Sequence, residues 1–318
     1  MAHQAPSGTG SPARYGPEAR AGGPDRALLC VHPHPDDETI ACGGVLARYS
    51  EAGARVKVVT CTGGEEGDNL AGIDLGDATM PEVRRHELHA ALGELGVREH
   101  EFLGYRDSGM AGAASNEDSA SFHRADLDEA GCRLATIIRS FRPDVVVGDD
   151  EHGTYGHPDH VKAHEVTTRA LQVAADPEEL GVEGRPWQVR KRYAHVMPRS
   201  RLIAFHERMI AEGLPSPFGH ESRPAELMPF GVPDEMITTA IDVRPWLARK
   251  RAALRAHASQ IGADSLFFNL PPDVAEAVFG TEYFMRLFGP SADEATEDDL
   301  FAGLPLARPP GPPARPGA

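Results

Sequence analysis

The chain has 318 residues, is 41% hydrophobic and carries a formal net charge of −16 at pH 7. This length suffices for one large α/β domain or for two smaller ones. Nucleic acid and anionic membranes need a basic surface, so this acidic composition argues against both as partners.

The sequence also indicates where the protein works. No stretch approaches the apolar length of a membrane span, and the first residues lack the apolar core of a signal peptide. The four cysteines form no CxxC pair, which predicts buried free thiols in a reducing compartment. We therefore expect a cytoplasmic protein that acts on a small molecule.

Both ends of the chain are poor in apolar residues. Residues 1–25 contain four prolines, and residues 289–318 are first acidic and then rich in proline. Such segments cannot bury enough apolar surface to fold. The sequence predicts two disordered tails around one folded domain at 26–288.

The first half of this domain alternates strand and helix patterns. Strands are predicted at 27–31, 55–61, 101–103 and 143–148, and helices at 39–51, 81–95, 126–141 and 158–174. This alternation is typical of an α/β fold with a mostly parallel sheet flanked by helices.

The second half is less regular and is expected to contribute to a pocket. Strand patterns occur at 188–196, 236–243 and 282–288, and helix patterns at 202–212 and 245–261. The proline- and glycine-rich stretch 213–233 is interpreted as a long loop or as a lid over the pocket.

Two related motifs follow strands of this predicted sheet. His34-Pro35-Asp36-Asp37-Glu38 comes after the strand 27–31, and Tyr155-Gly156-His157-Pro158-Asp159-His160 comes after the strand 143–148. Open α/β sheets bind ligands at the carboxyl ends of their strands. The two motifs can therefore meet if these two strands are neighbours.

Two imidazoles and one carboxylate can hold a catalytic divalent cation and leave a position for water. We expect His34, Asp37 and His160 to be the ligands. Asp36 then remains as a general base beside the cation. The sequence alone allows Asp36 and Asp37 to exchange roles, and either could cap the following helix.

Further residues near the motifs are candidates for catalysis or substrate binding. His157 and Tyr155 can donate hydrogen bonds to an oxyanion, and Asp159 can orient a neighbouring histidine. Arg84 and Asp107 are candidates for contacts with substrate hydroxyl groups. Two other loop histidines, His32 and His152, are expected to be structural or peripheral.

Together the two motifs resemble those of the LmbE/PIG-L family of metal-dependent de-N-acetylases. Further matches are the loop 61–67, the segments 84–88 and 106–109, and the helix with His257 and Gln260. The resemblance extends over about 27–288. It is closest to the deacetylase and the amidase of the mycothiol pathway.

The resemblance implies a Rossmann-like fold and the hydrolysis of an N-acetyl amino sugar or its glycoside to a free amine and acetate. It implies zinc at His34, Asp37 and His160, although this donor set also suits Fe²⁺. The implied roles of the remaining residues are a general base for Asp36, a general acid or oxyanion donor for His157, a mobile carbonyl-polarising group for Tyr155, and sugar contacts for Arg84 and Asp107.

Three alternatives stay open at this point. The chain could hydrolyse the amide of mycothiol S-conjugates. His34, Asp36 and His160 also satisfy the His-x-Asp…His pattern of non-haem iron oxygenases, which usually sits on a β-sandwich. The chain could also bind a metal or a sugar without catalysis. The sequence does not show whether the protein is a homo-oligomer.

Overall fold

The computed structural model describes residues 25–179, 181–214, 231–292 and 296–305, together with 23, 216 and 218–219. Most of the predicted lid at 213–233 lies outside the described residues, as do 1–22 and 306–318. The predictions for these segments are therefore untested.

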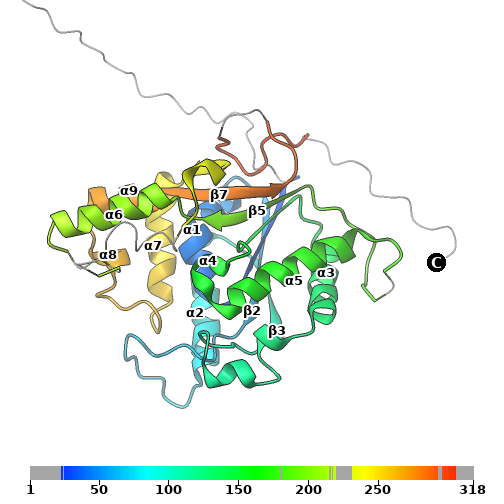
Figure 1. The fold of residues 1–318 in the computed structure, drawn as a ribbon, viewed down its shortest axis with the longest axis horizontal. Coiled ribbons are helices and arrows are strands. Elements are labelled where there is room, and N and C mark those ends of the chain that lie inside the picture. Colours follow the sequence, from blue (N-terminus) through cyan, green and yellow to red (C-terminus); the bar gives the residue numbers. More distant parts are fainter. Residues whose placement is uncertain are drawn as a thin grey trace, which may run out of the picture.

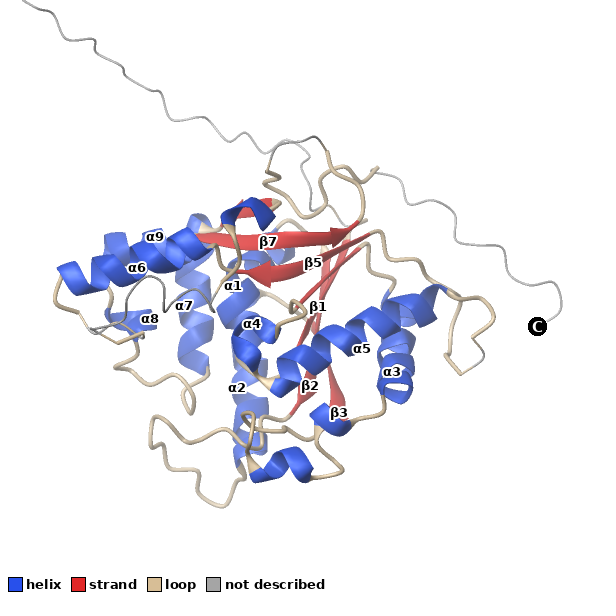
Figure 2. Ribbon diagram, viewed as in Figure 1, coloured by secondary structure: helices blue, strands red, loops and turns tan. Residues whose placement is uncertain are grey.

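A seven-stranded sheet forms the central layer, with helices on both sides (Figure 2). The strand order is β3-β2-β1-β4-β5-β7-β6. The first five strands pair in parallel, and β7 pairs antiparallel with β5 and β6. The strands are β1 (Ala27–His32), β2 (Arg55–Thr62), β3 (Glu99–Tyr105), β4 (Val145–Gly148), β5 (Lys191–Val196), β6 (Thr239–Asp242) and β7 (Thr281–Phe288). The α/β fold with a mostly parallel sheet is confirmed.

Helices cover the two faces of the sheet unequally (Figure 1). One face packs against α1 (Asp37–Glu51), α2 (Met80–Leu95) and α7 (Leu247–Ala256), and the other against α3 (Leu127–Phe141) and α5 (Pro158–Ala175). The remaining helices are α4 (Gly153–Gly156), α6 (Arg199–Ala211), α8 (Leu266–Asn269) and α9 (Pro272–Phe279), with short 3₁₀ turns at 114–117, 122–124, 234–236 and 244–246. Among the helices of the described segments, none combines the length and apolarity needed to cross a bilayer.

The alternation of side chains along β1 explains why this strand is apolar throughout. Leu28 and Cys30 belong to the core under α1, α2 and α7, whereas Leu29 and Val31 belong to the core under α3 and α5. A parallel strand that is buried on both faces needs such a continuous apolar run.

Local signals place the ends of α2 where the sequence predicts them. The backbone N–H of Thr79 donates to Glu82 Oε2 at 2.8 Å, which satisfies one of the unpaired donors at the start of the helix. Gly96 ends the helix with φ +77°, a left-handed conformation that glycine adopts at little cost. The predicted helix at 245–261 is shorter in the structure, because α7 ends at Ala256 and His257 turns into the protein interior.

The predicted disordered tail from residue 289 onward is wrong for residues 296–305. Leu300 and Phe301 are buried in the core beside α1, and the Phe301 ring meets Tyr49 edge-on at 5.1 Å. Glu297 pairs with the buried Lys191 at 3.1 Å. The low apolar content of the segment hid these few anchoring side chains.

We predict that Phe301→Ala lowers the free energy of unfolding by about 3–5 kcal/mol, because it leaves a cavity in the core. Denaturant unfolding measures this loss. The matched control is Phe288→Ala, since Phe288 is 37% exposed. Equal losses in the two variants would show that residues 296–305 are not part of the folded domain.

Candidate metal centre

The two histidine motifs meet where the strand order reverses. In the sheet, β1 lies between β2 and β4, so the loops after β1 and β4 leave the same edge in opposite directions. Such a switch point is the usual ligand site of an open α/β sheet. His34 comes from the loop after β1, Asp37 is the first residue of α1, and His160 lies in the first turn of α5.

The three predicted ligands lie together. Asp37 Oδ2 is 3.2 Å from His34 Nδ1 and 3.4 Å from His160 Nε2. Both histidines are buried, and the three side chains form a group whose donor atoms all lie within 4.8 Å of one another. Burial acts against the charge of Asp37, but the imidazoles of His160 and His34 hold the pKa of Asp37 below its ordinary value.

Surrounding carboxylates fix which nitrogen of each ring faces Asp37. His160 Nδ1 donates to Asp149 Oδ1 at 2.7 Å, which leaves Nε2 directed at Asp37. His34 Nε2 lies 3.4 Å from Asp107 Oδ1 and 3.3 Å from Asp159 Oδ2, which leaves Nδ1. Such outer contacts orient metal-binding histidines and raise their basicity.

Asp36 does not belong to this group. Its side chain contacts Arg84, whereas that of Asp37 lies between the two imidazoles. Its backbone has φ +120°, a conformation that costs a non-glycine residue free energy and recurs at functional sites. Its side chain does not cap α1, and Oδ2 lies 3.3 Å from Arg84 Nη2. Burial raises the pKa of Asp36 to about 6, against the opposing charge of Arg84.

Arg84 is buried and is engaged by the protein itself. Its guanidinium donates to the carbonyl oxygens of Pro35 at 2.7 Å and Gly64 at 3.1 Å, in addition to its contact with Asp36. The side chain therefore ties the loop after β1 to the loop after β2. This arrangement supports a positioning role for Arg84 more directly than the predicted sugar contact.

The other predicted residues surround the same point. His157 Nδ1 accepts a hydrogen bond from the backbone N–H of Asp159 at 3.1 Å, so the proton of the neutral ring lies on Nε2. Burial lowers the pKa of His157 to about 4. Asp159 Oδ2 accepts from Ser108 N at 2.9 Å and lies against His34, so the histidine it can orient is His34. The Tyr155 hydroxyl lies 3.4 Å from His160 Nε2, and this side chain is 48% exposed.

A cavity of about 510 Å³ opens over the group. Its walls come from the loops after β1, β2, β3 and β4, and the second half of the chain contributes His195 and Gln260. Nine predicted or newly found polar residues line it: His34, Asp36, Asp37, Arg84, Asp107, Tyr155, His157, His160 and His195. A volume of this size suits a small-molecule substrate.

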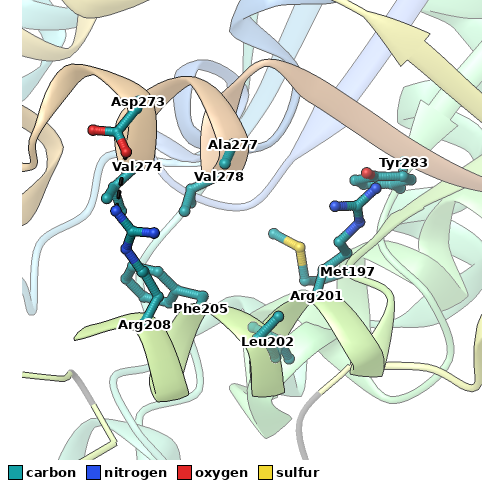
Figure 3. A pocket seen from close by; sticks show the side chains of 11 residues that line it. Met197, Arg201, Leu202, Phe205, Arg208, Asp273, Val274, Ala277, Val278 and Tyr283 are labelled. Carbon is teal, nitrogen blue, oxygen red and sulfur yellow. Dashed lines mark hydrogen bonds and ion pairs between the residues drawn. The ribbon is translucent and has the colours of Figure 1, made fainter. Parts of the chain in front are cut away.

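Another cavity, of about 170 Å³, lies between α6 and α9 (Figure 3). Its walls are mostly apolar, with Leu202, Phe205 and Val278 facing the hollow, and Arg208 at one end bonds to Asp273 at 3.0 Å. It holds none of the groups of histidine, cysteine and carboxylate side chains found among the described residues. The cavity at the sheet edge is therefore the candidate active site.

Sequence analysis missed Asp149 and His195, and it took His32 for a structural or peripheral residue. Asp149 follows β4 directly, and its Oδ1 also lies 3.1 Å from His195 Nε2. His257 is fully buried and pairs with Glu38 at 3.1 Å. The sequence signal for Asp149 is weak, because it is a single carboxylate directly after β4 and belongs to neither motif.

Convergent imidazoles and carboxylates in a cavity at the switch point of a parallel sheet define this protein as an enzyme of the α/β class. Residues 29–171 match the family described as PIG-L, GlcNAc-PI de-N-acetylase. The chain is 46% identical over 292 residues to the 1D-myo-inositol 2-acetamido-2-deoxy-alpha-D-glucopyranoside deacetylase of Geodermatophilus obscurus, covering 89% of this chain and 99% of that one. The deacetylase of the same name from Thermobifida fusca is 44% identical over 290 residues, covering 87% and 99%.

The chain therefore belongs to the PIG-L (LmbE) family and is a deacetylase, an enzyme that hydrolyses an N-acetyl amide. Solved structures agree in fold. N,N'-diacetylchitobiose deacetylase from Pyrococcus horikoshii matches with a TM-score of 0.56 and 20% identity, covering 82% of this chain and 84% of that one. The 4-carboxy-2-hydroxymuconate hydratase of Pseudomonas putida KT2440 also has a TM-score of 0.56 at 20% identity, covering 85% and 99%, so the fold alone does not fix the reaction.

We predict that Asp149→Asn weakens divalent-metal affinity by about 10- to 100-fold, because it removes the charge that orients His160. Competition with a chelator of known affinity measures the change. Glu151→Gln removes an exposed carboxylate two residues away and should leave the affinity unchanged. Equal affinities in wild type and Asp149→Asn would exclude this role for Asp149.

Proposed function

We propose that this protein removes the N-acetyl group of a glucosaminyl-inositol, the substrate named for its relatives, and releases a free amine and acetate. One observation carries the proposal: a spare carboxylate, Asp36, stands beside the group of His34, Asp37 and His160 without joining it. A hydrolase needs such a group to take a proton from water, whereas a site that only binds metal has no use for it.

A divalent cation fits the three donor atoms. Two imidazole nitrogens and a carboxylate oxygen face one another, and each ring is oriented by a carboxylate on its far side. This donor set is that of catalytic zinc sites, and Fe²⁺ suits it as well. When bound there, the cation would lower the pKa of a water and polarise the substrate carbonyl.

Asp36 is the proposed general base. Arg84 holds its carboxylate at the cavity wall, and the carbonyl contacts of Arg84 keep both side chains in place. The proton taken from the attacking water resides on Asp36 while the water oxygen bonds to the acetyl carbon.

His157 and Tyr155 are the proposed donors on the other side of the scissile amide. Because His157 Nδ1 accepts from the backbone, its Nε2–H is free to donate to the carbonyl oxygen as negative charge develops there. The exposed Tyr155 can swing toward the same oxygen. The proton that Asp36 took from the water then passes to the leaving nitrogen, and the C–N bond breaks to release the amine and acetate. Asp107, which is also in the cavity wall, is proposed to accept from a sugar hydroxyl.

The relatives favour deacetylation over the two other reactions considered. Both curated relatives named above are deacetylases, not amidases of mycothiol conjugates. An iron oxygenase of the considered type would use Asp36 as a ligand, but Asp36 pairs with Arg84, and the sheet is not a β-sandwich. Amidase activity remains the second candidate.

We predict amine and acetate release from GlcNAc-inositol in preference to a mycothiol S-conjugate and to simple N-acetylglucosaminides. Fluorescent amine labelling and an acetate assay measure the two products in parallel. Faster turnover of the S-conjugate would assign the chain to the amidase reaction. Failure with all amides, in a metal-loaded protein, would contradict the proposal.

Asp36→Asn should keep its metal and lose about 10²- to 10⁴-fold in kcat, because the proton acceptor is gone and the ligands are intact. His160→Ala should lose both metal and activity. Metal analysis and steady-state kinetics on the same preparations separate the two effects. Full activity of Asp36→Asn would remove its assignment as the base.

A further inference from the structure

A second row of metal-ligand side chains lies beside the candidate centre, at the ends of three neighbouring strands. Cys30 of β1 pairs with Val147 of β4, and Gly148 pairs with Ala194 of β5. Continuing this register places His32 beside Asp149 and Asp149 beside His195. Residues paired in this way on parallel strands point to the same face, about 4.8 Å apart.

The donor atoms of this row are close together. One donor atom from each of His32, Asp149 and His195 lies within 4.8 Å of the others. His195 Nε2 is 3.1 Å from Asp149 Oδ1, which is the separation of two ligands that can share one cation. Two imidazoles and one carboxylate form the same donor set as His34, Asp37 and His160.

Two of these residues carry buried polar atoms without a hydrogen-bond partner. His32 is fully buried, and neither ring nitrogen meets the geometry of a hydrogen bond, although the Cys30 thiol is close enough to interact with the ring electrostatically. Asp149 Oδ2 is likewise buried without a partner. Buried polar atoms are almost always paired, and an unseen ion is one explanation of an exception.

We propose that His32, Asp149 and His195 bind a second divalent cation next to the first. Asp149 would serve both centres. Its Oδ1 accepts a hydrogen bond from Nδ1 of His160, a proposed ligand of the first ion, and its carboxylate would ligate the second ion. For Nε2 of His195 to ligate the cation, the single proton of the neutral ring, which Nε2 shares with Asp149 Oδ1, moves to Nδ1. The proposal stands independently of the reaction that the first centre catalyses.

The second site can be reached from solvent, and its distance from the first sets the expected order of the two affinities. His195 lines the catalytic cavity and an adjoining one, so an ion can reach the row from solvent. Two dications this close repel each other, so the second ion should bind more weakly than the first.

His32 also belongs to a second group, with Cys30 and Cys42. The row with Asp149 is favoured for two reasons. Both cysteines are fully buried and interact with each other, whereas the row with Asp149 includes His195, which lines the cavity over the candidate centre. A thiol-bound ion is therefore the competing outcome of the test.

The experiment is metal titration of the apo-protein with Zn²⁺, followed by equilibrium dialysis and metal analysis. Wild type should bind two equivalents, a tight one and a weaker one. His195→Phe should keep the tight equivalent and lose the weaker one. The matched control is His152→Phe, since His152 is an exposed histidine in the loop after β4 and its replacement should leave both equivalents.

Titration with Co²⁺ tests separately whether the second ion is bound by a thiolate. The second Co²⁺ should produce no thiolate-to-cobalt charge-transfer band, and Cys42→Ser should still bind two equivalents. One equivalent in wild type, two in His195→Phe, or a thiolate band with the second Co²⁺ would each overturn the proposal.

Discussion

The in-register pairing of β1 with β4 is the constraint on which the site depends. Cys30 faces Val147 across this pair, so the chain leaves both strands at the same level of the sheet edge. The loop after β1 and the start of α1 then bring His34 and Asp37 to within reach of His160 on α5. Slipping this register by one residue would turn every side chain of β1 to the opposite face, and the two motifs would no longer meet.

The same edge gathers several buried or half-buried carboxylates, and each has a partner. Asp37 lies between two imidazoles, Asp36 contacts Arg84, and Asp159 accepts from Ser108. An uncompensated buried charge would cost several kcal/mol. The pairing supports the proposed roles, in which the carboxylate between the two rings ligates the cation and the one beside Arg84 takes the proton.

Sequence reasoning predicted the first half of the fold closely, since strands such as 27–31 and helices such as 81–95 carry clear periodicity and end signals. It also predicted that His34, Asp37 and His160 meet, because motifs at strand ends converge in a parallel sheet. It missed Asp149 and His195. The two residues lie near the site because β4 and β5 follow β1 in the sheet, an order that the sequence does not reveal. Each is also a single residue at the end of a strand and forms no recognisable motif. The packing of Phe301 was missed for a similar reason, as a few anchors in a polar segment give no pattern.

The most direct test is a crystal structure of the metal-loaded protein with anomalous diffraction measured at the absorption edge of the metal. The strongest anomalous peak should lie within coordination distance of His34 Nδ1, Asp37 Oδ2 and His160 Nε2, with Asp36 outside the ligand set. A strongest peak that is ligated by Asp36 instead of Asp37, or that lies away from His160, would contradict it.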